Sequence, residues 1–149
     1  MSATTNKFGM FIHWGLYGAT GVQDQVFARM DWPREKYEAL MHSFNPVKYD
    51  PEKWVLLAKE AGMEYICFTT KHHDGFALFK STADSYNCVD FSPFKRDIIG
   101  ELSAACKKYG LKFGIYYSQD LDWHEENGGG YKTEPVGCAG VSWDNSWDF

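Results

Sequence analysis

Three apolar runs divide the chain, and each is followed by polar or chemically reactive side chains. The runs are Phe8–Trp14, Glu64–Thr70 and Lys112–Ser118. The first is continuous rather than alternating, which is typical of a strand covered on both faces. The second is rich in residues that favour strands. The pattern therefore predicts three strands.

Helical patterns lie between these strands. Helices are predicted from about Pro33 to Phe44, from Asp50 to Gly62 and from Arg96 to Tyr109, whereas residues 15–32 and 81–93 are expected to form loops. Strands separated by helices indicate a parallel sheet with its helices on the outside. The predicted fold class is α/β. Each helix has an apolar face, which in the second consists of Trp54, Leu57, Ala58 and Ala61.

The periodic pattern stops after Ser118. Residues 119–149 contain no predicted helix or strand, and such a long irregular segment is unusual in a compact domain. The chain ends on Trp147-Asp148-Phe149, without a polar tail or a helix cap. We expect the segment to be a long functional loop or the stub of a region that continues. The 149 residues are also few for a closed eight-fold α/β barrel, which takes about 250.

Composition excludes several classes of partner. Fifteen Lys and Arg against twenty Asp and Glu give a net charge of −5, which argues against nucleic-acid binding. No stretch approaches the roughly 18 apolar residues of a membrane span. Residues 1–7 contain no signal peptide, and the compartment is left open. No Cys-x-x-Cys pair occurs, so reduced thiols are expected at Cys67, Cys88, Cys106 and Cys138.

The candidate chemistry lies where the strands end. In a parallel α/β sheet the carboxyl ends of the strands share one rim, and ligands bind there. Aromatic residues make up 17% of the chain, and an excess of them often lines a concave ligand site. A polar pocket with aromatic walls suits a sugar. The residues expected around its mouth are His13, His72, His73, Asp74, Tyr116 or Tyr117, Asp122 and Trp123.

Each of these residues also has a structural interpretation. A histidine at a strand end can be a satisfied structural residue, and one member of the His72-His73 pair can orient the other. Asp74 before Gly75 can simply cap a turn. The rings of Trp14 and Trp123 can belong to the core rather than to a ligand site.

Other kinds of chemistry have weaker support. His13, His72, His73 and Asp74 are legitimate metal ligands, but their spacing matches no compact metal motif, so we predict neither a metal nor a cofactor. No Gly-x-Ser-x-Gly motif occurs. No dinucleotide-binding or P-loop pattern follows a strand.

Three motifs strongly resemble the α-L-fucosidases of glycoside hydrolase family 29. They are Lys-Phe-Gly-Met-Phe-Ile-His-Trp-Gly at 7–15, Thr-Lys-His-His-Asp-Gly-Phe at 70–76, and Phe-Gly-Ile-Tyr-Tyr-Ser at 113–118 followed by Asp122-Trp123. The resemblance covers about residues 7–149. It identifies residues 1–149 as the N-terminal segment of a (β/α)8-like catalytic barrel, cut short after about three parallel strands with outer helices.

The resemblance implies a retaining exo-glycosidase that removes terminal α-L-fucose. By similarity, His13, His72 and His73 would hydrogen-bond the hydroxyls of fucose, and Tyr116, with Tyr117 as the alternative, would join them. Trp14 and Trp123 would lie on the sugar-facing rim. The expected partners are L-fucose or fucosylated glycans, and such enzymes are often secreted, periplasmic or lysosomal.

Two departures from the family pattern change this expectation. Where the family often has a Glu-Trp pair, this chain has Asp24-Gln25, which keeps a carboxylate on a shorter arm and loses an aromatic wall. The nucleophile and the acid/base of the family lie beyond Phe149, so no catalytic residue is assigned and the isolated chain is expected to be inactive unless it assembles. The alternatives are a non-catalytic fucose-binding half-barrel and a self-assembling one, with homo-oligomers formed through unpaired sheet edges.

Overall fold

Three strands and the helices between them form the described part of the chain. The computed structural model describes residues 8–30, 32–119 and 121–125. The loop expected at 119–149 therefore lies largely outside these residues, as do Cys138 and the N-terminal stretch. In chain order the elements are β1 (Gly9–Ile12), the 3-10 helix η1 (Leu16–Thr20), α1 (Val26–Arg29), α2 (Arg34–Glu38), the 3-10 helix η2 (Ala39–Ser43), α3 (Pro51–Glu60), β2 (Tyr65–Lys71), α4 (Ile98–Tyr109) and β3 (Lys112–Tyr117).

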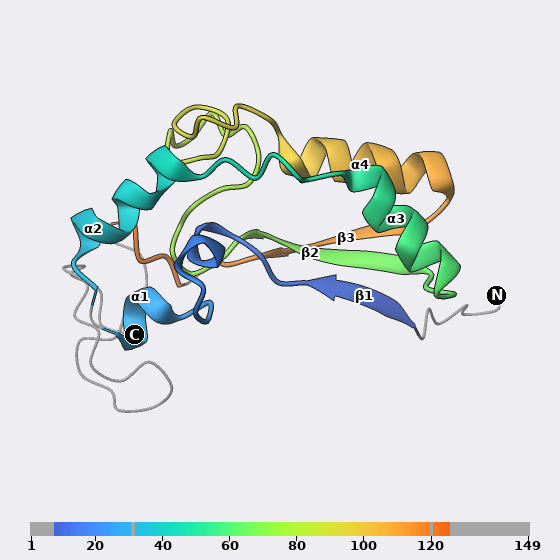
Figure 1. Cartoon of the computed structure of the whole chain (residues 1–149), viewed down its shortest axis with the longest axis horizontal. Helices are drawn as coiled ribbons and strands as arrows, with labels where there is room; N and C mark the ends of the chain where they lie inside the picture. The colour runs from blue at the N-terminus through green and yellow to red at the C-terminus, as the bar shows by residue number, and fades with distance from the viewer. Residues whose placement is uncertain (1–7, 31, 120, 126–149) are drawn as a thin grey trace.

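The strands form one parallel sheet in the order β1-β2-β3, which confirms the predicted α/β class. Phe11 pairs with Cys67, and Cys67 pairs with Gly114. The register of β2 against β3 shifts between Thr69 and Lys71. All three strands run toward the same end of the molecule, where η1, α1 and α2 gather (Figure 1).

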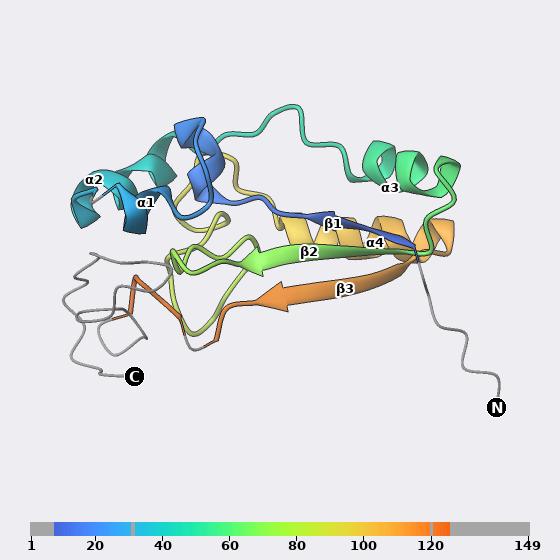
Figure 2. The same ribbon diagram turned by 90° about the horizontal axis from the view of Figure 1, so that it is seen from below.

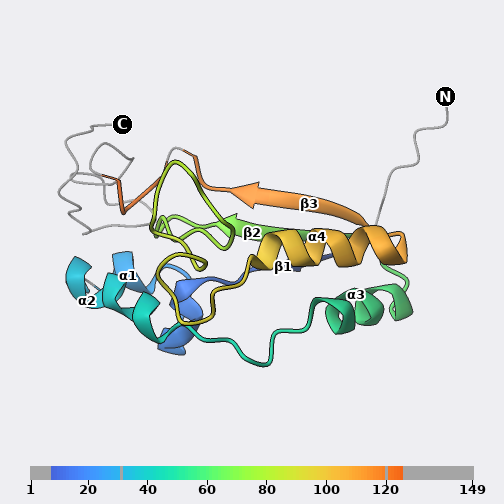
Figure 3. The ribbon, with the colours of Figure 1, turned by 90° about the horizontal axis from the view of Figure 1, so that it is seen from above.

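The helices cover one face of this sheet. Figure 1 shows α3 and α4 together above the strands, where the two helices contact each other. Accordingly, α4 lies behind the sheet in the view from below (Figure 2) and in front of it in the view from above (Figure 3). On that side Ile66 and Phe68 are fully buried, whereas Phe11, on the other side, is 55% exposed. Among the described residues, the second face of the sheet is therefore left bare.

His13 and Trp14, which were both expected at the rim, lie on opposite faces of the sheet. Successive side chains of a strand point to opposite faces. His13 follows Phe11 on the bare face, and its ring contacts Tyr17 and His72. Trp14 turns to the helix-covered face, where its ring packs against Phe44, Tyr49, Trp54 and Phe68 at centroid distances of 5.7–6.2 Å.

The long helices begin and end as predicted. The side chain of Asp50 accepts a hydrogen bond from the backbone of Lys53, and Asp97 does the same for Gly100, so each caps the N-terminus of its helix. Gly110 ends α4 in the left-handed conformation (φ 78°), which glycine adopts without strain.

Three details of the predicted helices are corrected. The helix from Pro33 to Phe44 is two pieces, α2 and η2, although its predicted apolar face does contact the core. In α3 the predicted stripe is confirmed at Ala58, which is buried, and at Trp54, which packs against the core, but it is wrong at Leu57, which is 59% exposed while Val55 is buried. Residues 15–32, expected to be a loop, carry η1 and α1.

The described part of the chain also answers two expectations drawn from composition. Cys67, Cys88 and Cys106 carry free thiols. None of the helices in residues 8–30, 32–119 and 121–125 combines the length and the apolar character needed to cross a membrane.

Candidate functional site

Side chains from three strand ends and one loop meet at the open end of the sheet. His13 follows β1, His72 and His73 follow β2, and Tyr116 is the penultimate residue of β3. Asp24 comes from the loop between η1 and α1. We call these five residues the histidine cluster. The predicted rim is therefore where the structure brings the reactive side chains together.

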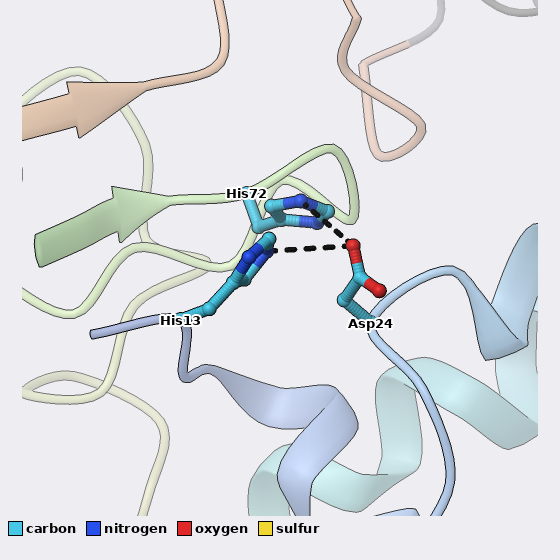
Figure 4. A group of neighbouring side chains, drawn as sticks. All are labelled: His13, Asp24 and His72. Carbon is cyan, nitrogen blue, oxygen red and sulfur yellow. Dashed lines mark ion pairs between the residues drawn. The ribbon is translucent and has the colours of Figure 1, made fainter. Parts of the chain in front are cut away.

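Asp24 contacts both His13 and His72. Its Oδ2 lies 3.4 Å from Nε2 of His13 and 3.3 Å from Nε2 of His72, as Figure 4 shows. The rings of His13 and His72 are 4.6 Å apart between centroids. The side chain of Asp24 is 29% exposed and that of His13 45%, so one side of this group remains open to a ligand.

His72 is the buried member of the cluster. Its side chain is only 3% exposed, and its ring lies against Tyr17, His73 and Tyr116. Burial, with smaller contributions from His73 and His13, lowers the pKa of His72 to about 3. The ring is therefore neutral at physiological pH and offers one donor and one acceptor.

Ser118 fixes the proton of His73. The hydroxyl of Ser118 donates to the carbonyl of Leu121 and lies 2.7 Å from Nδ1 of His73. Because a hydroxyl has one proton to donate, Nδ1 of His73 must donate to it. Burial also lowers the pKa of His73. The neutral ring therefore presents Nε2 as a hydrogen-bond acceptor.

The two tyrosines of β3 point in opposite directions. The ring of Tyr116 lies 6.0 Å from that of His72 and 6.5 Å from that of His73. Tyr117 is 47% exposed, and Nζ of Lys71 sits 4.6 Å above its ring. The structure thus places Tyr116 in the histidine cluster and Tyr117 on the other side of the strand.

Trp123 and Trp14 also lie in different places, one beside the histidine cluster and the other in the core. Trp123 is buried beside His73, at a centroid distance of 5.3 Å, and its backbone N–H donates to the carbonyl of His73. Trp14 lies in the core under α3, as described above. Of the two tryptophans expected at the rim, the structure brings only Trp123 to the histidines.

The remaining carboxylates of the motif are engaged elsewhere. Asp74 is buried, accepts hydrogen bonds from Tyr37 Oη at 2.6 Å and from the backbone of Phe76, and has its pKa raised by burial to about 6. It caps the turn at Gly75, the structural role considered from the sequence. Asp122 forms an ion pair with Lys71.

Tyr17 is the neighbour of the site that the sequence analysis missed. Its ring lies 5.8 Å from that of His13 and 5.2 Å from that of His72. Its hydroxyl is 3.5 Å from the hydroxyl of Thr69, and burial raises its pKa. No strand pattern marks residues 15–32, so only the three-dimensional fold reveals this contact.

Comparison with known proteins gives one consistent family. A family model described as Alpha-L-fucosidase matches residues 3–138. The chain is 52% identical to the α-L-fucosidase AlfC of Lactobacillus casei, solved in complex with its α-L-fucose product, with a TM-score of 0.85 over 97% of this chain and 48% of that one. For isoenzyme 1 of Paenibacillus thiaminolyticus the identity is 46% and the TM-score 0.81, over 86% and 30%.

The curated relatives agree. Human tissue α-L-fucosidase is 33% identical over an alignment that covers 86% of this chain and 32% of that protein. The chain therefore spans about a third of the length of its curated relatives and about half of the AlfC structure.

Proposed function

Because the chain belongs to the α-L-fucosidase family, we propose that the histidine cluster binds the hydroxyl groups of a terminal α-L-fucose residue. The observation that carries this proposal is the convergence of His13, Asp24, His72, His73 and Tyr116 from four separate segments. The relative AlfC, solved with α-L-fucose, supports it.

The chemistry of the cluster suits neighbouring sugar hydroxyls. A hydroxyl both donates and accepts, so it is best met by groups of mixed character. His72 and His73 are neutral, Asp24 accepts only, and Tyr116 can do either. A hydrogen bond to a charged group such as Asp24 contributes about 1.5–3 kcal/mol, roughly twice a neutral one.

We propose that catalysis uses groups from outside the described residues. A retaining glycosidase uses two carboxylates about 5–5.5 Å apart, which flank the glycosidic bond. In the described part of the chain, Asp24 faces two histidines, Asp74 is buried against Tyr37, and Asp122 is paired with Lys71. We propose that the nucleophile and the acid/base belong to a further part of a longer enzyme, in which this sheet forms the first three strands of a (β/α)8-like barrel.

Binding is tested by calorimetric titration of the protein with L-fucose, with D-fucose as the control sugar. We expect a Kd in the millimolar range for L-fucose, about −4 kcal/mol, because the cluster lines one side of the sugar only. His13→Ala and Asp24→Asn should each weaken binding about tenfold. His42→Ala, a change of an exposed histidine on η2, is the matched control and should leave it unchanged.

Two outcomes contradict the proposal. One is the absence of heat at millimolar L-fucose with protein that is folded by circular dichroism. The other is equal binding of the two enantiomers. Release of 4-nitrophenol from its α-L-fucoside tests the catalytic part separately, because turnover at rates normal for fucosidases would show that a carboxylate pair is present in this chain.

A non-catalytic sugar-binding role is the second candidate. The engagement of Asp74 and Asp122 in structural contacts favours it for the chain by itself. Binding of L-fucose without hydrolysis of the nitrophenyl fucoside is the result expected for such a protein.

A further inference from the structure

Three members of the histidine cluster have the composition of a transition-metal site. Nε2 of His13, Nε2 of His72 and Oδ2 of Asp24 converge from β1, β2 and the loop before α1 (Figure 4). We propose that these three atoms bind a divalent transition-metal ion of the Zn²⁺ class, and that the ion competes with the sugar for the site.

The spacing of the donor atoms supports the proposal. Zinc bonds to imidazole nitrogen and carboxylate oxygen are about 2.0–2.1 Å long, so two ligands of a tetrahedral ion lie about 3.3–3.4 Å apart. The two distances from Asp24 Oδ2, 3.4 Å to His13 and 3.3 Å to His72, equal that edge. A single ion can therefore bridge Asp24 to either histidine without moving the loop.

The remaining distance of the site is the one between Nε2 of His13 and Nε2 of His72, and a movement of His13 would adjust it. The three donor atoms all lie within 4.8 Å of one another. The side chain of His72 is buried, whereas that of His13 is 45% exposed, so His13 is the ligand that would turn toward the other. The exposed side of His13 and Asp24 also provides the path by which an ion enters.

The donor set selects the kind of ion. Two imidazoles and one carboxylate suit zinc and its neighbours in the first transition row, whereas Mg²⁺ and Ca²⁺ prefer oxygen ligands alone. Three protein ligands leave a fourth position open to water.

Binding is measured with the untagged 149-residue chain by titration with Co²⁺, followed by visible absorption, and with Zn²⁺ by calorimetry. We expect one ion per chain and the intense absorption of a four-coordinate Co²⁺ site. Asp24→Asn, which keeps the shape and removes the charge, and His13→Gln should each weaken Zn²⁺ binding by at least about tenfold. Asp90→Asn, at a carboxylate remote from the histidine cluster, should not.

Three results overturn the proposal. They are the absence of a four-coordinate Co²⁺ spectrum in folded protein, equal Zn²⁺ affinity in the wild type, Asp24→Asn and His13→Gln, and a sulfur-to-cobalt charge-transfer band, which would place the ion on a cysteine.

The metal site and the sugar site are tested separately by a competition experiment with L-fucose. Only the expected competition between ion and sugar rests on the proposed function. Metal binding with no binding of L-fucose supports the metal site and contradicts the sugar site. Binding of L-fucose with no binding of Zn²⁺ does the reverse. Displacement of the ion by L-fucose, with both lost in Asp24→Asn, supports the two together.

Discussion

The hydrogen bond between His73 and Ser118 determines what the histidine cluster can offer a ligand. Ser118 lies beyond β3, and its hydroxyl donates its proton to the carbonyl of Leu121. Its oxygen therefore accepts from His73, which keeps Nδ1 protonated and leaves Nε2 as the acceptor. A ring turned over or in the other tautomer would present a donor at the same place. The direction of this one hydrogen bond therefore makes Nε2 of His73 an acceptor for a donor group of a ligand.

Replacing Ser118 by Ala should release this tautomer. We expect the affinity for L-fucose to fall about five- to tenfold, which corresponds to about 1 kcal/mol, the usual net value of one hydrogen bond. The ¹⁵N chemical shifts of the His73 ring should change from those of the Nδ1–H form to a mixture of both forms.

The control is Ser103→Ala, at an exposed serine on α4. It should change neither the shifts of His73 nor the affinity. Unaltered ring shifts in Ser118→Ala would contradict the role given to Ser118, whatever happens to stability.

Single residues also mark how far the sequence alone could go. The rule that parallel strands share one rim predicted the meeting of His13, His72 and His73, because it depends only on where strands end. It could not decide between Tyr116 and Tyr117, since the register shift after Thr69 in β2 is set by packing. Asp24 entered only through the resemblance, because nothing local shows that its loop folds back onto β2.

At the scale of elements, α2 is linked to the segment after β3 by ion pairs that centre on Glu38. Glu38 Oε1 lies 2.8 Å from Nδ1 of His124 and 2.8 Å from Nε of Arg34, and Asp84 Oδ2 is 3.8 Å from the other nitrogen of His124. Burial alone would lower the pKa of His124, but the hydrogen bond and charge of Glu38, with Asp84, outweigh it and leave this pKa raised. Despite burial, His124 and Arg34 lower the pKa of Glu38.

These two shifts predict a window of pH in which the link is strongest. A raised histidine pKa stabilises the fold below its ordinary value of 6.5, and that contribution is lost as the pH rises through the folded-state pKa. A lowered glutamate pKa stabilises above 4.5, and that contribution is lost as the pH falls through the folded-state pKa. Glu38→Gln should therefore cost most, on the order of 1 kcal/mol, between about pH 4.5 and 6.5.

The measurement is the free energy of unfolding in urea, for the wild type and Glu38→Gln, from pH 4 to pH 9. The difference between them should shrink toward pH 9. Glu60→Gln, at the exposed end of α3, is the matched control and should show a small difference at every pH. A difference for Glu38→Gln that does not change with pH would contradict the ion pair.

Elements were easier to predict than their details. The strands and the two long helices have strong apolar patterns, and Asp50 and Asp97 mark the helix starts. The region from Leu16 to Arg29 was missed because its helices span only a turn or so, too short for a periodic signal. The stripe of α3 was right at Trp54 and Ala58 and wrong at Leu57, because the helix is turned so that Val55 is buried and Leu57 lies outside.

At the scale of the whole molecule, the sheet is closed on one face only. Both β1 and β3 have an edge that no described strand pairs with, and unpaired edges recruit partners. Phe11 on the bare face and Ile115 on β3 are 55% and 62% exposed. In a complete barrel, neighbouring strands and helices would cover Phe11 and Ile115. Because both side chains are exposed in this structure, they favour association with another chain.

We therefore predict that the protein self-associates through its sheet. Size-exclusion chromatography with light scattering should give a mass above the 17.1 kDa of one chain and a distribution that depends on concentration. Phe11→Lys and Ile115→Lys should each shift it toward the monomer, because a buried lysine on the bare face or near the edge opposes association. Leu57→Lys, at an equally exposed apolar position on α3, should leave the mass unchanged.

The same experiment connects assembly to the site. The histidine cluster lies at one end of the bare face, so a partner that covers this face would form a second wall of the proposed sugar site. If self-association builds that wall, L-fucose should bind more tightly as the protein concentration rises, and Phe11→Lys should remove the dependence. A sharp monomer peak at every concentration would contradict assembly and leave any sugar binding to the single chain.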